Sequence, residues 1–210
     1  QLGLLKIRKA IKELNNPCKN IPAIQVVGTN GKGSITAFLE SILILAKKNI
    51  GVTTSPHLID ICERIRVNKK KINNEKFENL FKKIENNLSK HKLSPFELII
   101  CCALQFFELK KVELLILEAG LGGRLDATSG HSLRPIIAIS SIGLDHKDYL
   151  GDSIEQIAKE KVAVIEKNSI VVSSRQNINV EEIIQKRAKE VGAKIIWKEP
   201  LSDDYELGLK

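Results

Sequence analysis

The chain has 210 residues and a formal net charge of +8, with 33 Lys and Arg against 25 Asp and Glu. Its 43% share of hydrophobic residues is typical of a globular protein, and no apolar run approaches the roughly 18 residues that a membrane-spanning helix needs. Lys outnumbers Arg 26 to 7 and aromatic residues are scarce, which favours a solvated basic surface with a general attraction for anions over a nucleic-acid interface.

The cysteines do not form a metal-binding or redox motif. None is spaced as CxxC, and two are adjacent inside an apolar run. We therefore expect Cys18, Cys62, Cys101 and Cys102 to be buried, reduced thiols of a cytoplasmic protein. The sequence starts at Gln1, contains no methionine and stops at GLK, so we expect it to be a fragment of a longer protein.

Helices and strands are predicted to alternate along the chain. The first half contains, in order, a helix over 3–14, a strand over 24–28, a helix over 32–47, a strand over 50–55, a small strand pair formed by 63–67 and 69–72, and helices over 74–90 and 95–109. The second half contains strands over 112–120 and 136–143, a helix over 153–167, a strand over 169–174, a helix over 179–191 and a strand over 194–198. The polar stretch 68–76 is interpreted as a loop, and 199–210 as a linker or an edge toward an absent domain.

This pattern predicts the fold class. The continuous apolar runs at 112–120 and 136–143 are typical of strands that are buried on both faces of a sheet. Strand–helix alternation with short connections predicts an α/β domain over 1–198, with a doubly wound, mostly parallel sheet flanked by helices.

Ligands of such sheets bind beyond the carboxyl ends of the strands. Four predicted strands deliver reactive residues to that edge. They deliver GTNGKGS at 28–34, TSPH at 54–57, Glu118 followed by AGLGGRLD, and LDH at 144–146. The convergence of these residues at one edge indicates a functional site there more strongly than any one motif does.

The segment 28–34 has the properties of a phosphate-binding loop. A glycine-rich turn between a strand and a helix presents backbone amides, and the positive end of the helix dipole, to an anion. Lys32 can reach terminal phosphates, and Thr29 or Ser34 can bond a phosphate or a metal. The match to GxxxxGK[ST] is incomplete, because Val26 stands where the first Gly belongs and Gly33 separates Lys32 from Ser34. A purely structural turn stays an alternative for the loop taken alone.

Three further residues end predicted strands next to this loop. Glu118 is the acid that usually accompanies a phosphate loop, where it holds Mg²⁺ directly or through water. Ser55 and His146 end neighbouring strands. Each of the three has an ordinary alternative, as an exposed strand-end acid or a turn residue, and together they favour a metal site.

Several motifs together resemble the folylpolyglutamate synthase/dihydrofolate synthase family, which belongs to the Mur ligase superfamily. The motifs are GTNGKGS at 28–34, TTSPHL at 53–58, ERIRVN at 63–68, SPFE at 94–97, LEAGLGGRLDATS at 117–129 and SIGLDHKDYLGDSIEQIAKEK at 141–161. The resemblance covers nearly all of 1–175, and the combination is highly specific. Other Mur ligases share GTNGK but lack TSPHL and GLGGRLDAT.

The resemblance implies an N-terminal, ATP-binding domain of an ATP- and Mg²⁺-dependent amide ligase. In this family ATP phosphorylates the carboxylate of dihydropteroate or of a folate, and the amine of L-glutamate attacks the acyl phosphate. The expected partners are therefore small-molecule substrates, with no nucleic acid and no membrane. A monomeric state is common in the family. The C-terminal domain, which closes over ATP and binds glutamate, is expected to be absent from this chain, so that the chain alone is inactive.

The resemblance also implies roles for individual residues. Residues that hold the ATP phosphates are expected to be Asn30, Gly31, Lys32, Gly33 and Ser34. The Mg²⁺ ligands match Ser55, Glu118 and His146. The segments that contact the pterin substrate match Ser94, Pro95, Phe96, Glu97, Leu125, Asp126 and Ala127, with Arg124 beside them. The sequence departs from the family at Ser129, where Asn is usual, and at 166–168, which replace a common turn.

Lys161 is a candidate on grounds of periodicity as well as resemblance. At about 100° per residue, Ile154, Ile157, Ala158 and Ile165 share one face of the predicted helix, and Lys161 lies in the middle of that face. A lysine that extends its stem out to solvent is the alternative. A desolvated amine is biased toward its neutral form, which alone can add CO₂. The resemblance places at this position a carbamylated lysine that holds a second Mg²⁺ beside His146.

Three other functions compete with this interpretation. A Mur-type amino-acid ligase shares the phosphate loop, and a phosphate-loop regulatory ATPase would bind a protein partner. A nucleic-acid-binding module would account for the net charge of +8. The regulatory ATPase leaves TSPHL and LGGRLDAT unexplained, and the nucleic-acid module requires clustered Arg and exposed aromatic residues, which are missing. Whether the enzyme adds the first glutamate, later ones or both is left open by the sequence.

Overall fold

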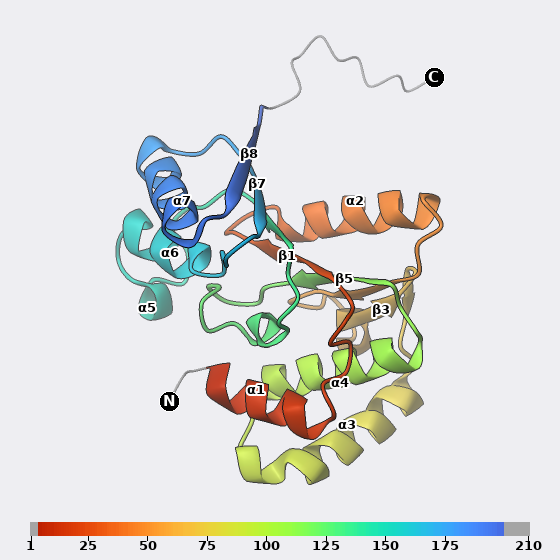
Figure 1. Ribbon diagram of the computed structural model, residues 1–210. Coiled ribbons are helices and arrows are strands. Elements are labelled where there is room, and N and C mark those ends of the chain that lie inside the picture. Colours follow the sequence, from red (N-terminus) through yellow and green to blue (C-terminus); the bar gives the residue numbers. More distant parts are fainter. Residues whose placement is uncertain (1–3, 200–210) are drawn as a thin grey trace.

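One mixed sheet with the strand order β4-β3-β2-β5-β1-β6-β7-β8 organises the computed structural model, which describes residues 4–199 (Figure 1). The strands are β1 Ala23–Val27, β2 Ile50–Thr53, β3 Ile65–Val67, β4 Lys70–Lys71, β5 Leu114–Glu118, β6 Ile136–Ile139, β7 Ile170–Ser174 and β8 Lys194–Lys198. The α-helices are α1 Leu4–Glu13, α2 Lys32–Leu45, α3 Asn74–Leu88, α4 Pro95–Leu109, α5 Lys147–Leu150, α6 Ile154–Val162 and α7 Ile178–Val191. Short 3₁₀ helices are η1 Ile61–Arg64, η2 Ser89–His91 and η3 Ala127–Gly130.

The sheet is mostly parallel, as predicted. From β2 to β8 in the strand order, all neighbouring strands run parallel. The short strands β3 and β4 extend the β2 edge in antiparallel pairing, which confirms the predicted strand pair. Because β2, β5, β1 and β6 are consecutive in the sheet, the four motif-bearing strand ends are neighbours at one edge.

Helices cover the two faces of the sheet unequally. Along β1, Ile24 and Val26 pack with Ile35 and Leu39 of α2, so these alternate positions face that helix. The opposite face is covered by α1, α3 and α4 at one end and by α6 and α7 at the other (Figure 1). Within residues 4–199, α2 is the only helix on its face. Phe38, Ile42 and Leu45 of this helix are exposed, so both sides of α2 are apolar.

A buried polar network lies between the two groups of helices. The side-chain amide of Gln25, in the middle of β1, donates hydrogen bonds to Thr128 Oγ1 and Ser129 Oγ, both at 2.9 Å. Arg134 donates to Gln25 Oε1 and to the carboxylate of Glu166. The two departures from the family motif, at Ser129 and around Glu166, therefore lie in one network beneath β1.

Several predicted elements are longer than the observed ones. The helix predicted over 153–167 ends at Val162, because Val164 turns inward and packs against Gly123 while the chain reverses toward β7. The strand predicted over 136–143 ends at Ile139, because the backbone of 140–143 bonds to the segment after β1 instead of continuing the ladder. The predicted strand 112–120 is only Leu114–Glu118, since Val112 still bonds to the end of α4.

The stretch 68–76 is a loop only in part. It contains β4, and α3 begins at Asn74 with a cap from the Asn73 side chain, which accepts a hydrogen bond from the backbone of Lys76. The helix predicted from Pro95 to Leu109 is confirmed at both ends. Residue 199 is the last one described, so most of the predicted linker 199–210 lies outside the described residues.

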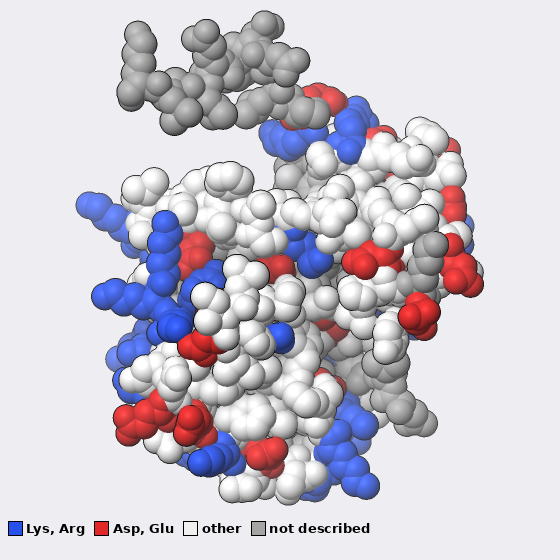
Figure 2. All heavy atoms as spheres, turned by 180° about the vertical axis from the view of Figure 1, so that it is seen from behind, with Lys and Arg blue, Asp and Glu red and all other residues white. Residues whose placement is uncertain are grey.

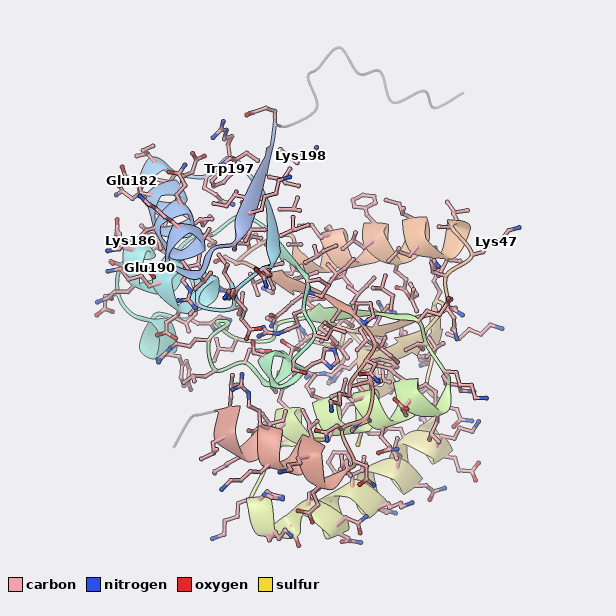
Figure 3. All side chains as sticks on the ribbon, viewed as in Figure 1. Lys47, Glu182, Lys186, Glu190, Trp197 and Lys198 are labelled. Carbon is pink, nitrogen blue, oxygen red and sulfur yellow. The ribbon has the colours of Figure 1, made fainter. Side chains whose placement is uncertain are left out.

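The burial of the cysteines and the distribution of surface charge agree with what the composition predicts. All four cysteines are buried and free, as expected. No helix of the described chain is long and apolar enough to cross a membrane. Lys and Arg gather most densely along one edge of the rear face and elsewhere alternate with acidic groups (Figure 2). On α7, the side chains of Glu182, Lys186 and Glu190 extend outward from the helix (Figure 3).

Candidate active site at the carboxyl edge of the sheet

The glycine-rich loop is a close-packed turn that leaves the start of α2 open. Gly28 has φ 140°, and a Cβ atom there would lie 1.9 Å from Ser140 Oγ, so glycine is required. Gly31, with φ 87°, precedes the first helical residue, and no side chain caps the helix. The amides of the first turn therefore face an open position at the positive end of the helix dipole, which suits an anion.

Lys32 lies over this loop. Its Nζ donates hydrogen bonds to the carbonyl oxygens of Gly28 at 3.2 Å and Thr29 at 3.0 Å. The side chain is half-buried and has no carboxylate partner within 4 Å among the described ion pairs. The ammonium is thus held beside the open helix start, where a phosphate would meet it.

The loop is anchored by the segment that follows β6. Ser141 O accepts hydrogen bonds from the amides of Thr29 at 2.7 Å and Asn30 at 3.3 Å. The Thr29 hydroxyl pairs with the backbone of Gly143, with 3.1 Å to both its carbonyl oxygen and its amide nitrogen. The sequence identifies Thr29 as a phosphate ligand, whereas its hydroxyl is used here to fix the loop. The partner Ser141 was missed, because contacts across more than a hundred residues leave no local signal.

Glu118 ends β5 beside β1 and is almost completely buried, at 4% exposure. Burial raises the pKa of its carboxyl to about 7, while the charges on Lys32 and Arg66 oppose the rise. Within the described residues, Glu118 Oε2 and Thr36 Oγ1 are buried without a hydrogen-bond partner. A buried carboxylate oxygen without a donor needs a compensating group.

Arg66 is a second residue that the sequence did not single out. It forms a part-buried ion pair with Glu40 of α2 at 3.0 Å and donates to Thr54 Oγ1, next to Ser55. Arg66 therefore ties α2 to the end of β2, and its charge acts on the carboxyl of Glu118. The motif ERIRVN contains Arg66, and the alternation of charged and apolar residues along this segment was the signal that could have identified it.

A divalent cation fits the orphaned oxygen atoms at Glu118 and Thr36. Mg²⁺ prefers oxygen ligands, and a carboxylate with an unused lone pair is the usual protein donor. Ser55, half-buried after β2, can supply a hydroxyl from the next strand. His146 is exposed after β6, and its Nε2 lies 3.4 Å from Asp145 Oδ2. Among the described residues no group of three His, Cys, Asp or Glu side chains is assembled for a metal.

Lys161 is buried, as its place on α6 predicts. It is 2% exposed and lies on the same face as Ile157, Ala158 and Val162, so the alternative of a lysine that reaches solvent is wrong. Its Nζ donates to the carbonyl oxygen of Gly28 at 2.8 Å. Burial, followed by the charge of Lys32, lowers the pKa of Lys161 to about 8.

The two segments matched to substrate binding are in contact. A Cβ atom on Gly120 would lie 2.9 Å from the Phe96 ring, so the start of α4 packs against the loop after β5. Ser94 and Glu97 form a capping box around Pro95, in which each side chain accepts a hydrogen bond from the backbone of the other. Their polar atoms therefore serve the helix start.

Asp126 organises the loop after β5 from inside. Its carboxylate accepts hydrogen bonds from the amides of Gly120, Leu121 and Thr128 and from the Thr128 hydroxyl. Burial raises its pKa, while these bonds oppose the rise. Ala127 begins η3 and is buried, and Leu125 is half-buried. These bonds make Asp126 an internal support of the loop that carries the predicted substrate residues.

Arg124 joins this loop to α6. Its amide donates to the carbonyl oxygen of Glu160 at 3.0 Å, and its guanidinium pairs with the Glu160 carboxylate. Gly123 beside it has no room for a side chain, because a Cβ atom would lie 2.6 Å from Lys161 O. The backbone of the loop is thereby fixed against the turn of α6 that carries Lys161.

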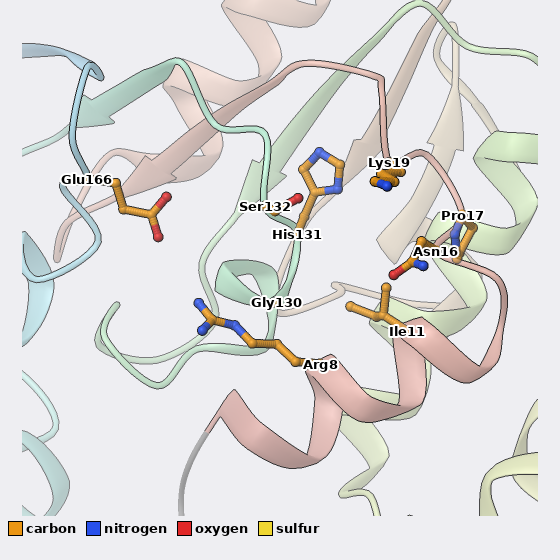
Figure 4. A pocket seen from close by; sticks show the side chains of 9 residues that line it. All are labelled: Arg8, Ile11, Asn16, Pro17, Lys19, Gly130, His131, Ser132 and Glu166. Carbon is orange, nitrogen blue, oxygen red and sulfur yellow. The ribbon is translucent and has the colours of Figure 1, made fainter.

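Two surface pockets lie away from this edge. One, of about 380 Å³, is formed by α1, the turn before β1 and the chain that leads into β6 (Figure 4). The other, of about 330 Å³, lies beside β4 and is lined by four lysines. Neither pocket includes a predicted site residue. The candidate site is therefore separate from these two cavities.

The family model of the Mur ligase middle domain matches residues 26–199. The chain belongs to the Mur ligase middle domain family. In this Mur ligase middle domain, the glycine-rich loop, Glu118 and Lys161 all lie within the matched residues. The match begins within β1, at Val26, and includes β8, so it reaches every strand of the described sheet.

Individual relatives agree with this result. The chain is 33% identical to the dihydrofolate synthetase of Saccharomyces cerevisiae over 201 residues, which cover 93% of the chain and 47% of the yeast protein. It is 34% identical to E. coli FolC, in a structure with DHPP and ADP, with TM-score 0.87 and coverage of 94% and 47% of the two chains.

A bifunctional folylpolyglutamate synthase/dihydrofolate synthase of Yersinia pestis, crystallised with AMPPNP and Mn ion, is 35% identical, with TM-score 0.86 and coverage of 94% and 47%. The chain thus spans about half the length of the relatives it matches.

Proposed function

We propose that this chain is the nucleotide-binding part of an ATP-dependent ligase that adds L-glutamate to dihydropteroate, to folylpolyglutamates or to both. One observation carries the proposal. The ammonium of Lys32 and the orphaned carboxylate oxygen of Glu118 come from adjacent strand ends beside an uncapped helix start. The names of the three relatives support the acceptor class.

The residues of the loop bind and orient the nucleotide in this proposal. The amides of Gly31, Lys32, Gly33 and Ser34 donate to phosphate oxygens, with the Asn30 side chain beside them. The ammonium of Lys32 exchanges its bonds to loop carbonyls for the terminal phosphates. These donors are already in place, so they stabilise charge that develops on the transferred phosphoryl group.

A divalent cation would be held by Glu118 and Ser55, with His146 as a further ligand. When bound, it neutralises phosphate charge and orients the oxygens of the transferred group. Glu118 with a pKa of about 7 must lose its proton to act as a ligand, so the affinity for the cation rises with pH across that range. Lys161, if carbamylated, would supply a second carboxylate beside the loop at Gly28.

The chemical steps balance without any further reactant. A carboxylate oxygen of the acceptor attacks the γ-phosphorus of ATP, the bond to the leaving ADP oxygen breaks, and an acyl phosphate forms. The amine of glutamate then attacks the acyl carbon, the carbon–oxygen bond breaks, and phosphate leaves with the acceptor's oxygen. We assign the acceptor to the exposed side of the loop after β5 and the adjoining start of α4 at 94–97, with Asp126 and Ala127 supporting that loop from inside, and the capture of glutamate to residues outside the described part.

The oxygen balance gives a direct test on the full-length protein that contains this sequence. Dihydropteroate or tetrahydrofolate with an ¹⁸O-labelled carboxylate should transfer one labelled oxygen to the released phosphate when ATP and glutamate are present. The relative rates with the two acceptors separate first-glutamate addition from chain extension. Unlabelled phosphate released without any acceptor would instead indicate a regulatory ATPase, and dependence on a cell-wall precursor would indicate a Mur-type amino-acid ligase.

A further inference from the structure

Gln176 lies just beyond the carboxyl end of β7 and makes three side-chain hydrogen bonds. Its Oε1 accepts from the amide of Ile142 at 3.0 Å, and its Nε2 donates to Ser140 O at 3.1 Å and to Ser173 Oγ at 3.2 Å. The side chain is half-buried, and its backbone amide donates to Glu181 of α7 at 2.8 Å. The side chain of Gln176 is therefore held by the segment after β6, and its backbone is held by the first turn of α7.

These bonds begin where the β6–β7 ladder stops. The last registered pair of the two strands is Ile139 with Ser173. Beyond it, the side chain of Gln176 bonds the carbonyl of Ser140 and the amide of Ile142, the two backbone groups that flank Ser141. A single side chain thus takes the place of the neighbouring strand and keeps residues 140–142 extended past the end of the ladder.

The opposite side of the same segment holds the phosphate loop. Ser141 O accepts from the amides of Thr29 and Asn30, and Gly143 pairs with the Thr29 hydroxyl. Ser140 also limits the approach of Gly28, since its Oγ fills the space of a Cβ atom. The segment 140–143 is therefore held between Gln176 and the loop, and a displacement on one side reaches the other.

We propose that Gln176 is a positioning residue for nucleotide binding, which rests on the function proposed above. By holding 140–142 it sets the place of Thr29 and Asn30, and hence the direction of the amides that meet the phosphates. It touches neither nucleotide nor metal itself.

The test compares three variants of the 210-residue chain. Gln176→Ala removes both hydrogen-bonding atoms, and Gln176→Glu keeps the acceptor for Ile142 but loses the donor to Ser140. Gln185→Ala, at an exposed glutamine of α7, is the matched control. Mg·ADP affinity is measured by calorimetry, and amide hydrogen exchange of Thr29 by NMR.

The Ala variant should bind Mg·ADP about tenfold more weakly, because the two hydrogen bonds from Gln176 to the backbone of Ser140 and Ile142 are lost. Exchange at Thr29 should become faster although Thr29 does not touch Gln176. The Glu variant should be equally weak near pH 8 and should recover relative to wild type toward about pH 4, where a carboxyl with an ordinary pKa of about 4.3 is largely protonated and can donate to Ser140 O.

Two results would overturn the proposal. One is wild-type affinity together with unchanged Thr29 exchange in a folded Gln176→Ala chain. The other applies if that variant does not fold: a Gln176→Glu chain whose affinity does not recover at low pH would equally contradict the proposal. Failure of the wild-type chain to bind Mg·ADP would count against the proposed function, while the exchange of Thr29 would still report on the positioning.

Discussion

Lys161 of α6 donates a 2.8 Å hydrogen bond to the carbonyl oxygen of Gly28, the same oxygen that accepts from Lys32 at 3.2 Å. One backbone atom of the phosphate loop therefore receives two ammonium groups from different helices. The two like charges are close enough for Lys32 to contribute to the lowered pKa of Lys161. An amine in this position gains from being neutral, which is the form that reacts with CO₂.

Replacing Lys161 by Ala should abolish most activity of the full-length ligase while leaving nucleotide binding at Lys32 within about threefold, because the Gly28 carbonyl that loses Lys161 keeps its bond from Lys32. Added acetate should restore part of the turnover by supplying the missing carboxylate. Lys159→Ala, at an exposed position on the same helix, is the control. In wild-type protein, ¹³C-labelled bicarbonate should give a carbamate resonance that Lys161→Ala lacks, and wild-type turnover in the variant would show that Lys161 is structural.

Lys32→Ala should weaken ATP binding by about 10- to 100-fold, because a charge-assisted bond to phosphate is lost. The fold should persist, with a free energy of unfolding changed by no more than about 1 kcal/mol, since Lys32 bonds only loop carbonyls. Calorimetric titration and chemical denaturation measure the two effects. Lys47→Ala, at the far end of α2 (Figure 3), provides a charge-matched control. Equal affinity in folded Lys32→Ala protein would remove the phosphate assignment.

Glu118→Gln tests the carboxyl that lacks a partner. Its folded-state pKa of about 7 lies above the ordinary value of 4.5, so the folded state binds the proton more tightly. The contribution to stability is complete below about pH 4.5 and is lost as the pH rises through 7. In EDTA at pH 8 the Gln variant should therefore exceed wild type in free energy of unfolding by about 1–3 kcal/mol.

The same comparison at low pH provides the control. Near pH 5 the difference between Glu118→Gln and wild type should nearly vanish, because the wild-type carboxyl is then protonated. Mg²⁺ should stabilise wild type at pH 8 and have little effect on the variant. A variant less stable than wild type at pH 8 would mean that the carboxylate has a partner in solution.

Gly28→Ala and Gly33→Ala form a matched pair within one loop. Gly28 has φ 140° and no room for a Cβ atom, so alanine there should lower the free energy of unfolding by about 2–4 kcal/mol. Gly33 has nothing within 4 Å of an added Cβ atom, and alanine should change stability by less than about 1 kcal/mol. Urea denaturation checks both, and similar losses in the two variants would refute the packing argument.

The sequence was sufficient for features that depend on local pattern. The parallel sheet, the adjacency of four strand ends and the burial of Lys161 follow from apolar runs and helical periodicity. The start of α4 at Pro95 follows from the proline itself, which is favoured in the first turn of a helix. In each case the determining residues lie close together in the chain.

Features that depend on distant contacts were not predictable. The chain leaves β6 after Ile139 because Ser141 bonds to Thr29, and the strand pattern alone continues to residue 143. Asp126 resembles an exposed ligand in the motif GRLDAT, yet its acceptors are filled by the backbone of its own loop. Arg66 and Thr36 acquire a role only because α2 and β3 meet beside Glu118.

The buried amide of Gln25 also restricts how the chain can assemble. It lies on the strand that pairs with both β5 and β6, and its partners Thr128, Ser129 and Arg134 come from the connection between those two strands. A slip of β1 by one residue would turn Gln25 toward the apolar underside of α2 and leave Arg134 without its acceptor. Such a misregistered sheet would contain buried unsatisfied polar groups, so the network selects one alignment of the central strand and, with it, one position for the glycine-rich loop at its end.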